Sequence, residues 1–145
     1  DMKSALESHF PSTDYLFMSA AVSDARPVQR ASEKIKKADF RSIELVENID
    51  VLKSLTANKS QQLVVAFAAE TDSDSVAEAQ AKMVRKGADV IYLNNVSGGA
   101  IFGSVATSGS IIDATGLVKE FTDITKESLA HALLNHAITV RNKLG

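Results

Sequence analysis

Three short apolar runs separated by helix-like segments constrain the fold of this chain more than any other feature. They span residues 14–22, 63–69 and 89–93, and near-continuous apolar runs are typical of strands that are covered on both faces in a parallel sheet. Strands that alternate with helices predict a doubly wound α/β fold. Because ligands of such folds bind at the loops leaving the carboxyl ends of strands, the informative residues are expected directly after these runs.

Capping residues mark the expected helices. Asn48 is placed to cap a short helix, and Thr125 is placed to cap the final one. Ser75 and Glu78 have the spacing of a capping box, and the helix that they open is expected to end at Gly87. The apolar positions expected to face the core are Val51, Leu52 and Leu55 after Asn48, then Val76, Met83 and either Ala79 or Gln80, then Leu129, Leu133, Ala137, Val140 and Leu144.

The remaining segments complete a mostly parallel sheet. Residues 42–46 alternate like a further strand, residues 2–9 have a helical pattern, and residues 23–40 form a long polar connection. Residues 110–113 and 117–121 predict an antiparallel hairpin at the sheet edge. We therefore expect a three-layer α/β sandwich in a single domain of 145 residues.

Composition excludes several classes of protein. The chain has no cysteine, which excludes disulfides, thiolate metal sites and cysteine nucleophiles. A formal charge of -2 argues against a nucleic-acid partner, because such proteins usually carry a strongly basic face. The apolar runs are far shorter than the roughly 20 residues of a membrane span, and no secretory leader opens the sequence. We therefore expect a cytoplasmic protein with small-molecule ligands and no membrane contact.

Basic residues gather in the connection that follows the first apolar run. They are Arg26, Arg30, Lys34, Lys36, Lys37 and Arg41. The connection is either a solvated surface loop, as most charge runs are, or a lid that folds over a phosphate-bearing ligand. Because it leaves the carboxyl end of an expected strand, the two interpretations carry about equal weight.

Charged side chains also follow the other expected strands. Asp24 and Glu70 either face one crevice and ligate a hard metal ion such as magnesium, or each caps a turn, which is the commoner case. Lys82 and Lys86 lie one helical turn apart beside Glu78. They form either a salt-bridged outer helix face or two cations that converge on a triphosphate.

Spacing excludes several familiar sites. His131 and His136 lie about 140° apart around a helix, so they cannot share a metal ion and are interpreted as ordinary helix residues. Gly98 and Gly103 have the outer spacing of a P-loop, but no lysine follows them. No dinucleotide glycine fingerprint occurs, which makes a nicotinamide-dependent oxidoreductase a weak alternative.

Four motifs occur in order along the chain, at residues 19–27, 33–37, 67–71 and 82–96. The most specific are Ala20-Ala21-Val22-Ser23-Asp24 and Lys34-Ile35-Lys36-Lys37. Their order and spacing resemble those of the phosphopantothenate–cysteine ligases of the bacterial CTP-dependent type, over essentially the whole chain. The resemblance implies a Rossmann-like fold and a homodimer. It also implies that the family's first glycine-rich strand and loop are missing here.

The resemblance implies a reaction in coenzyme A biosynthesis. Such ligases use Mg²⁺ and the co-substrate CTP to convert the carboxylate of 4'-phosphopantothenate into an acyl-cytidylate. The amine of cysteine then attacks this intermediate to give phosphopantothenoylcysteine. FMN is expected only if the protein is fused to a flavin-dependent decarboxylase. The chemistry needs no protein thiol, so the absence of cysteine does not oppose it.

The resemblance also implies the site residues. Lys34 is expected on the lid, with a catalytic role in converting the acyl-cytidylate to product, and Asp24 is expected near the phosphates and the metal ion. Residues 48–52 correspond to the loop around the base and ribose, and Lys82 and Lys86 to the triphosphate contacts. The implied CTP-binding residues are Ala20, Ala21, Asp24, Lys34, Asn48, Ile49, Asp50, Val51, Leu52, Phe67, Lys82 and Lys86.

Three positions depart from the family pattern. Ile49 replaces a usual proline, which removes a fixed φ from the base-binding loop. Ala66 replaces a usual glycine, and Asn95 replaces a usual aspartate. The main alternative function is a nucleotide-binding module of the same architecture without turnover.

Overall fold

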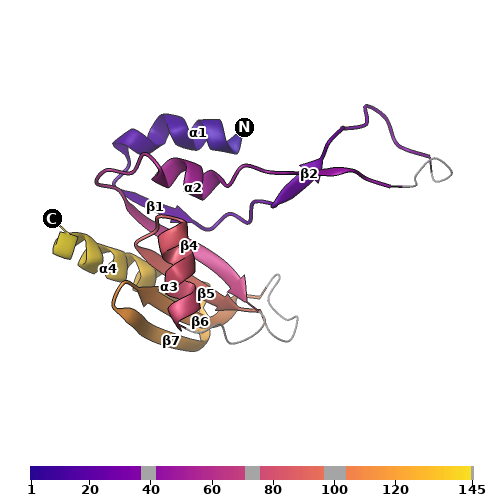
Figure 1. Cartoon of the computed structure of the whole chain (residues 1–145). Helices are drawn as coiled ribbons and strands as arrows, with labels where there is room; N and C mark the ends of the chain where they lie inside the picture. Colours follow the sequence, from indigo (N-terminus) through magenta and orange to yellow (C-terminus); the bar gives the residue numbers. More distant parts are fainter. Residues whose placement is uncertain (37–41, 71–75, 97–103, 145) are drawn as a thin grey trace.

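The computed structural model describes residues 1–36, 42–70, 76–96 and 104–144, and it has a Rossmann-like α/β fold (Figure 1). Helices and strands alternate along most of the chain. Their order is α1 (Met2–His9), a short 3₁₀ helix (Phe10–Ser12), β1 (Tyr15–Met18), β2 (Ala25–Pro27), β3 (Leu45–Glu47), α2 (Val51–Thr56), β4 (Leu63–Glu70), α3 (Val76–Arg85), β5 (Val90–Asn95), β6 (Ala106–Asp113), β7 (Gly116–Thr125) and α4 (Lys126–Leu144).

The main sheet has five strands in the order β1-β4-β5-β6-β7. Strands β1 and β4 pair in parallel, as do β4 and β5. Strand β6 is antiparallel to both β5 and β7, so β1, β4, β5 and β7 all run in the same direction. The predicted mostly parallel sheet with an antiparallel edge hairpin is confirmed.

Helices cover both faces of this sheet. Val64 and Ala66 of β4 pack in a core cluster with residues of α2 and α3, whereas Leu63 and Val65 pack in a second cluster with α4. Successive residues of a strand point to opposite faces, so β4 separates two helical layers. Figure 1 shows α1, α2 and α3 on one side of the sheet. The predicted three-layer sandwich is confirmed.

Most predictions for the core-facing positions and the ends of α3 and α4 are confirmed, and one core-facing position is wrong. Ala79 is fully buried and Gln80 is only half-buried, which settles the alternative left open in α3. The backbone N–H of Ser128 donates to Oγ1 of Thr125 over 3.1 Å, so Thr125 caps α4 as expected. Gly87 has a φ of +64°, the left-handed conformation that ends many helices. Leu144 is 69% exposed, however, because α4 extends beyond the core.

The predictions for residues 14–22 and 42–46 need correction. Strand β1 ends at Met18, and the residues that follow it are exposed. Strand β3 (Leu45–Glu47) does not join the main sheet but pairs antiparallel with β2 (Ala25–Pro27) in a separate two-stranded sheet. Part of the expected loop is therefore a strand, because a partner distant in sequence supplies its hydrogen bonds.

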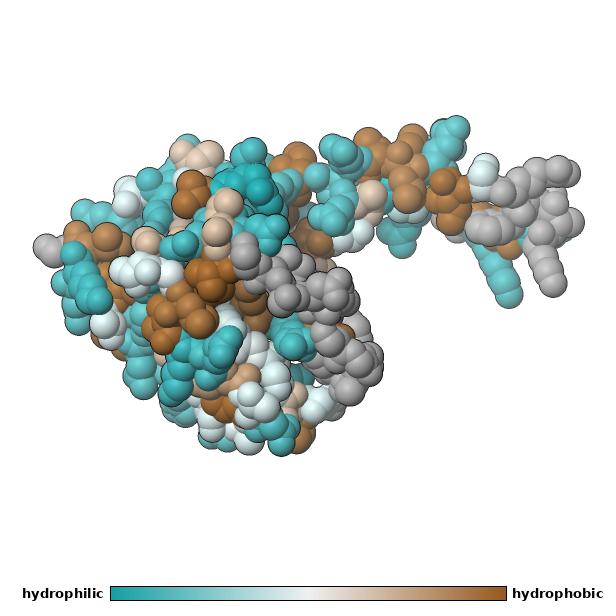
Figure 2. Space-filling view, turned by 60° about the horizontal axis from the view of Figure 1, so that its bottom comes forward, coloured by the Kyte–Doolittle hydropathy of each residue, from teal (hydrophilic) through white to brown (hydrophobic). Residues whose placement is uncertain are grey.

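These two strands form an arm that projects from the body of the molecule (Figure 1). We use "the arm" for residues 23–36 and 42–48. Hydrophobic side chains lie on its surface among polar ones (Figure 2). The exposed apolar residues are Val28, Ile35, Ile43, Leu45 and Val46.

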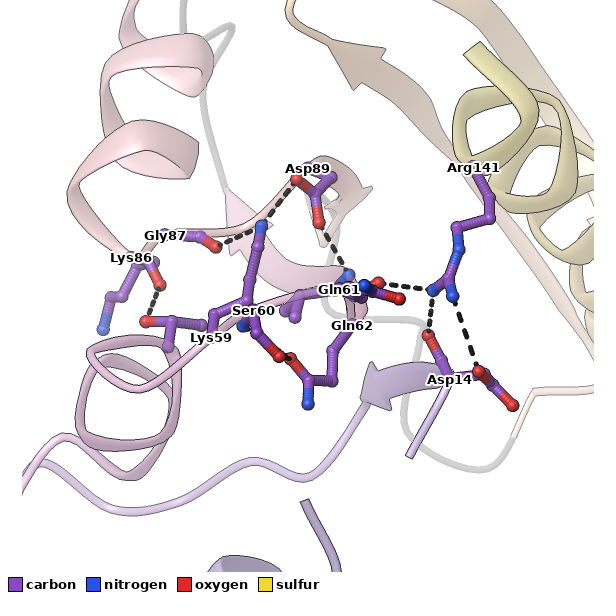
Figure 3. Close-up of polar contacts among 11 residues, drawn as sticks. Asp14, Lys59, Ser60, Gln61, Gln62, Lys86, Gly87, Asp89 and Arg141 are labelled. Atoms are coloured by element: carbon purple, nitrogen blue, oxygen red, sulfur yellow. Dashed lines mark hydrogen bonds and ion pairs between the residues drawn. The ribbon is translucent and has the colours of Figure 1, made fainter. Parts of the chain in front are cut away.

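A polar network joins α4 and the loops at the amino ends of the strands (Figure 3). Lys59 Nζ lies 2.6 Å from Asp89 Oδ1, and the other carboxylate oxygen of Asp89 accepts a hydrogen bond from the backbone of Val64 over 2.8 Å. Arg141 of α4 donates to the carbonyl oxygen of Asp14 over 3.1 Å. These contacts stabilise the end of the sheet opposite to the candidate site. None of the helices in the described part of the chain has the length and apolar character needed to cross a bilayer.

Candidate functional site

A pocket of about 730 Å³ lies at the carboxyl ends of β1, β4 and β5. The sheet forms one wall, and the first half of α4 forms the facing wall through Leu129 and Leu133. Tyr92 and other apolar side chains line most of the surface. The volume is in the range of small-molecule sites, and the position is the one at which parallel α/β folds bind ligands.

Three of the expected nucleotide-binding residues line this pocket. Ala20 and Ala21 follow β1, and Phe67 lies near the end of β4. The Phe67 ring meets the Tyr92 ring edge to face, with 6.0 Å between the ring centroids. Small alanine side chains leave room beside two aromatic rings, an arrangement that suits a flat ligand group.

Polar groups in the pocket include Asn94, which sequence analysis did not select. Thr107 Oγ1 donates to Asn94 Oδ1 over 2.6 Å, and the Tyr92 hydroxyl lies 3.5 Å from Thr107 Oγ1. Burial raises the pKa of Tyr92 above its usual value of 10.0, so this hydroxyl stays neutral. Asn94 lines the pocket, and its side-chain amide nitrogen is a hydrogen-bond donor. Asn94 lies next to the carboxyl end of a central parallel strand, and this position was the signal that could have identified it.

The base of the arm brings Asp24 and Asn48 together. The backbone N–H of Asn48 donates to the carbonyl oxygen of Asp24 over 2.7 Å, and its side-chain amide donates to the carbonyl oxygen of Ser23 over 2.7 Å. Arg26 Nη1 donates to Asn48 Oδ1 over 2.9 Å. Two separate motifs therefore meet where the arm joins the body.

The predicted helix cap at Asn48 is wrong, because these contacts occupy its side chain. Asp50 caps α2 instead, and its Oδ1 accepts a hydrogen bond from the backbone of Lys53 over 3.0 Å. The other carboxylate oxygen, Oδ2, lies 2.6 Å from Lys86 Nζ. Burial raises the pKa of Asp50, but hydrogen bonds from Lys86 and Lys53 and their charges outweigh it, so the pKa lies below 3.8.

The other expected residues lie in different surroundings. Val51 and Leu52 are each 8% exposed and pack in the core, so their side chains do not face a ligand, whereas Ile49 is 62% exposed. Lys34 is an exposed residue of the arm and does not line the pocket. Lys82 is half-buried on α3.

Some predicted contributors lie outside the described residues. These are Lys37, Arg41, Ser75 and the side chain of Glu70. Across the described part of the chain, no group of three or more His, Cys, Asp or Glu residues has the arrangement of a metal site. Asp24 is exposed, and its carboxylate has no ion pair or hydrogen bond with another described residue. One free carboxylate matches a magnesium ion whose other ligands are phosphate and water.

Comparisons with known proteins relate this chain to proteins named for coenzyme A biosynthesis. It is 33% identical over 146 residues to the coenzyme A biosynthesis bifunctional protein CoaBC of Mycobacterium bovis, covering 93% of this chain and 35% of that protein. The CoaBC protein of Bacillus subtilis is 31% identical over 147 residues, covering 100% of this chain and 36% of that protein. The chain therefore spans about a third of the length of these curated relatives.

A solved structure and a family model give the same relationship. The crystal structure of the C-terminal domain of a CoaBC protein matches with a TM-score of 0.74 and 28% identity, over 98% of this chain and 62% of that one. The model of the DNA/pantothenate metabolism flavoprotein C-terminal domain matches residues 1–140. The chain therefore belongs to the family of DNA/pantothenate metabolism flavoprotein C-terminal domains.

Proposed function

We propose that this chain carries a ligase function of coenzyme A biosynthesis, the CTP-dependent joining of cysteine to 4'-phosphopantothenate. Family membership and the CoaBC relatives support a ligase in this pathway. The four sequence motifs support the finer assignment to CTP and an acyl-cytidylate intermediate.

The observation that carries this proposal is the meeting of distant motifs near one end of the sheet. Ala21 and Phe67 line one pocket. Asp24 follows Ala21 closely in the chain and is hydrogen-bonded to Asn48, which belongs to a distant motif. A site built from residues this far apart in sequence is what a nucleotide with separate base, ribose and phosphate groups requires.

The proposed chemistry has two balanced steps. A carboxylate oxygen of 4'-phosphopantothenate attacks the α-phosphorus of CTP, and pyrophosphate leaves. The cysteine amine then attacks the acyl carbon and loses a proton, and CMP leaves with the electrons of the broken acyl–oxygen bond. Both steps depend on positioning and on cations that offset the phosphate charge, a role suited to Lys34, Lys82 and Lys86.

Magnesium fits the residues that are present. Asp24 offers a carboxylate that has no ion pair or hydrogen bond with another described residue, and magnesium typically needs few protein ligands when phosphates supply the rest. Bound magnesium would neutralise part of the triphosphate charge. In this proposal Asp24 holds the ion in place while the lysines contact the phosphate oxygens.

A homodimer is part of the proposal and is supported by the arm. Leu45 is 63% exposed, Ile43 is 54% exposed and Val28 is 53% exposed. Apolar side chains gathered on a thin two-stranded ribbon are costly in water and are typical of a protein–protein contact. Sedimentation of the purified chain tests this proposal, and a monomer at all concentrations would contradict it.

Calorimetric titration with magnesium CTP tests the nucleotide assignment, with ATP and GTP as controls. We expect binding that is selective for CTP and weaker when magnesium is removed. Asp24→Asn should reduce this dependence on magnesium. Equal affinity for all three nucleotides, or no binding, would contradict the assignment. CTP binding without any product from 4'-phosphopantothenate and cysteine would favour the alternative, a nucleotide-binding module without turnover.

A further inference from the structure

Two polar residues that line the pocket are hydrogen-bonded to each other. They are Asn94 and Thr107, and Thr107 Oγ1 donates to Asn94 Oδ1 over 2.6 Å. We propose that Thr107 is a positioning residue that fixes the Asn94 amide as a hydrogen-bond donor toward the ligand, so that the pocket selects cytosine against uracil. This inference rests on the proposed function, because it takes the pyrimidine ring of CTP as the flat group that the pocket binds.

The hydrogen bonds run in one direction from Tyr92 to Asn94. A threonine hydroxyl has a single proton, and Thr107 uses it in the bond to Asn94 Oδ1. In the longer contact of 3.5 Å between the two hydroxyl groups, Tyr92 is therefore the donor and Thr107 the acceptor. Tyr92 is 2% exposed and Thr107 is 7% exposed, so these buried hydroxyls depend on each other and on Asn94 for partners.

The backbone of β6 is shaped to bring Tyr92 and Thr107 together. A β-carbon at Gly109 would lie 2.6 Å from the Tyr92 hydroxyl oxygen and 2.8 Å from the ring carbon that carries it, so the tyrosine ring lies where a larger residue would be. The register of β6 against β7 also shifts between Thr107 and Gly109. Such irregularities redirect side chains and are common beside binding sites. The missing side chain and the register shift together allow the tyrosine hydroxyl to approach Thr107.

A fixed amide can distinguish the two pyrimidines. When Thr107 holds the amide oxygen of Asn94, the group offered to a ligand is the amide nitrogen, which can only donate. The ring nitrogen N3 is an acceptor in cytosine, whereas in uracil it carries a proton and donates. A donor that faces N3 therefore bonds to cytosine and repels uracil, and repulsion of the wrong ligand is a common source of specificity. An amide free to turn over would present its oxygen and accept the proton of uracil.

Calorimetric titration with magnesium CTP and magnesium UTP measures this preference. The wild type should bind CTP about tenfold more tightly than UTP, the size expected of one hydrogen bond. Thr107→Val removes the hydroxyl and keeps a β-branched side chain suited to a strand, and it should reduce the preference to about twofold or less by improving the binding of UTP. Thr107→Ser keeps the hydroxyl and should retain the preference. Thr122→Val is the matched control, because Thr122 is exposed on β7 and does not line the pocket.

A double-mutant cycle tests whether Thr107 acts through Asn94. Asn94→Ala removes the amide and should also abolish the preference for CTP over UTP. In that background Thr107→Val should cause no further change in the preference, because the group that it positions is absent. A role of Thr107 in stability alone would leave the preference of Thr107→Val unchanged, so the cycle separates positioning from a structural effect.

The possible outcomes separate this inference from the proposed function. If the wild type binds CTP in preference to ATP and GTP but binds UTP equally well, the inference is wrong and the nucleotide assignment stands. A preference for CTP that persists in Thr107→Val or Asn94→Ala, or an equal loss in Thr122→Val, also overturns the inference alone. If the wild type binds none of these nucleotides, both proposals fail.

Discussion

Asn48 hydrogen-bonds to Asp24 through its backbone N–H over 2.7 Å, and this contact closes the base of the arm. The side chain of Asn48 adds contacts to Ser23 and Arg26 on the opposite segment. The residues of the first motif are thus held against the loop expected to surround the base and ribose. Asn48 therefore determines where the arm lies relative to the candidate site.

Asn48→Ala should loosen the arm without unfolding the body. The variant loses the hydrogen bonds to Ser23 and Arg26, each contributing about 1 kcal/mol. Amide hydrogen exchange of β2 and β3 should accelerate several-fold, while amides of β4 and β5 stay protected. Asn135→Ala, at an exposed position on α4, is the matched control. Unchanged exchange in β2 and β3 would show that Asn48 does not hold the arm.

Much of the fold was predictable from sequence because it depends on local patterns. The apolar run of β4, the hairpin of β6 and β7, and the cap at Thr125 each depend on residues close together in the chain. Their hydrophobic periodicity and turn chemistry are visible without tertiary information. These elements form much of the main sheet and help to determine the position of the pocket.

The arm and the cap of α2 were not predictable in the same way. Strands β2 and β3 pair across a long separation, and Leu45 and Val46 remain exposed, so no burial pattern marks the pairing. Asn48 has the side chain of a helix cap, but contacts with Ser23 and Arg26 occupy it. The arm and the cap of α2 both depend on contacts between segments distant in sequence. Such contacts cannot be predicted from the local pattern of a single sequence.

Lys34→Gln should slow product formation while leaving CTP affinity nearly unchanged. Lys34 lies on the arm and does not line the pocket, so it is not required to hold the base or ribose. Loss of a cation that stabilises developing charge typically costs about 10²-fold in turnover. Titration with CTP and an assay of phosphopantothenoylcysteine formation measure the two quantities. Lys143→Gln, at an exposed position near the end of α4, is a control for loss of a lysine, and unchanged turnover in Lys34→Gln would exclude the catalytic role.

Filling the pocket from either wall should block the ligand. Ala21 lies on the sheet side and Ala130 on α4, and both line the pocket. Ala21→Phe and Ala130→Phe should each reduce CTP affinity at least about tenfold, because the added ring occupies ligand volume. Ala57→Phe, at an exposed position after α2, should have no effect. If Ala21→Phe alone weakens binding, the nucleotide lies beside β1 but outside the pocket.

Gly109→Ala should destabilise the fold beside the pocket. A β-carbon at Gly109 would overlap the carbonyl oxygen of Leu93 and lie 2.6 Å from the Tyr92 hydroxyl oxygen. Relief of this overlap requires β6 to move away from β5, at a cost of about 1 to 3 kcal/mol in the free energy of unfolding. Urea denaturation measures the loss, with Ser110→Ala on the same strand as the control. Equal stability of the two variants would mean that β6 adjusts freely.

Asp113 provides an acid-sensitive contact between the β6–β7 hairpin and α4. It is 7% exposed, its Oδ2 lies 3.0 Å from His136 Nε2, and Oδ1 accepts hydrogen bonds from the backbone and hydroxyl of Thr115. Burial raises the pKa of Asp113, but the Thr115 hydrogen bonds and the His136 interaction outweigh it, so the pKa lies below 3.8. His136, interpreted from sequence as an ordinary helix residue, therefore has a specific partner.

The lowered pKa of Asp113 predicts how stability changes with pH. A carboxyl group whose pKa is lower in the folded state contributes its full stability above its unfolded pKa near 3.8, and loses it as the pH falls through the folded pKa. Asp113→Asn should lose about 1 to 3 kcal/mol at pH 7. It should also show a smaller loss than the wild type when the pH is lowered from about 5 to 3. Urea denaturation at both pH values measures this difference. Asp123→Asn is the matched control, because Asp123 is exposed and asparagine tolerates its positive φ of 51°. Parallel stability curves for the wild type and Asp113→Asn between these pH values would show that the contact does not govern acid sensitivity.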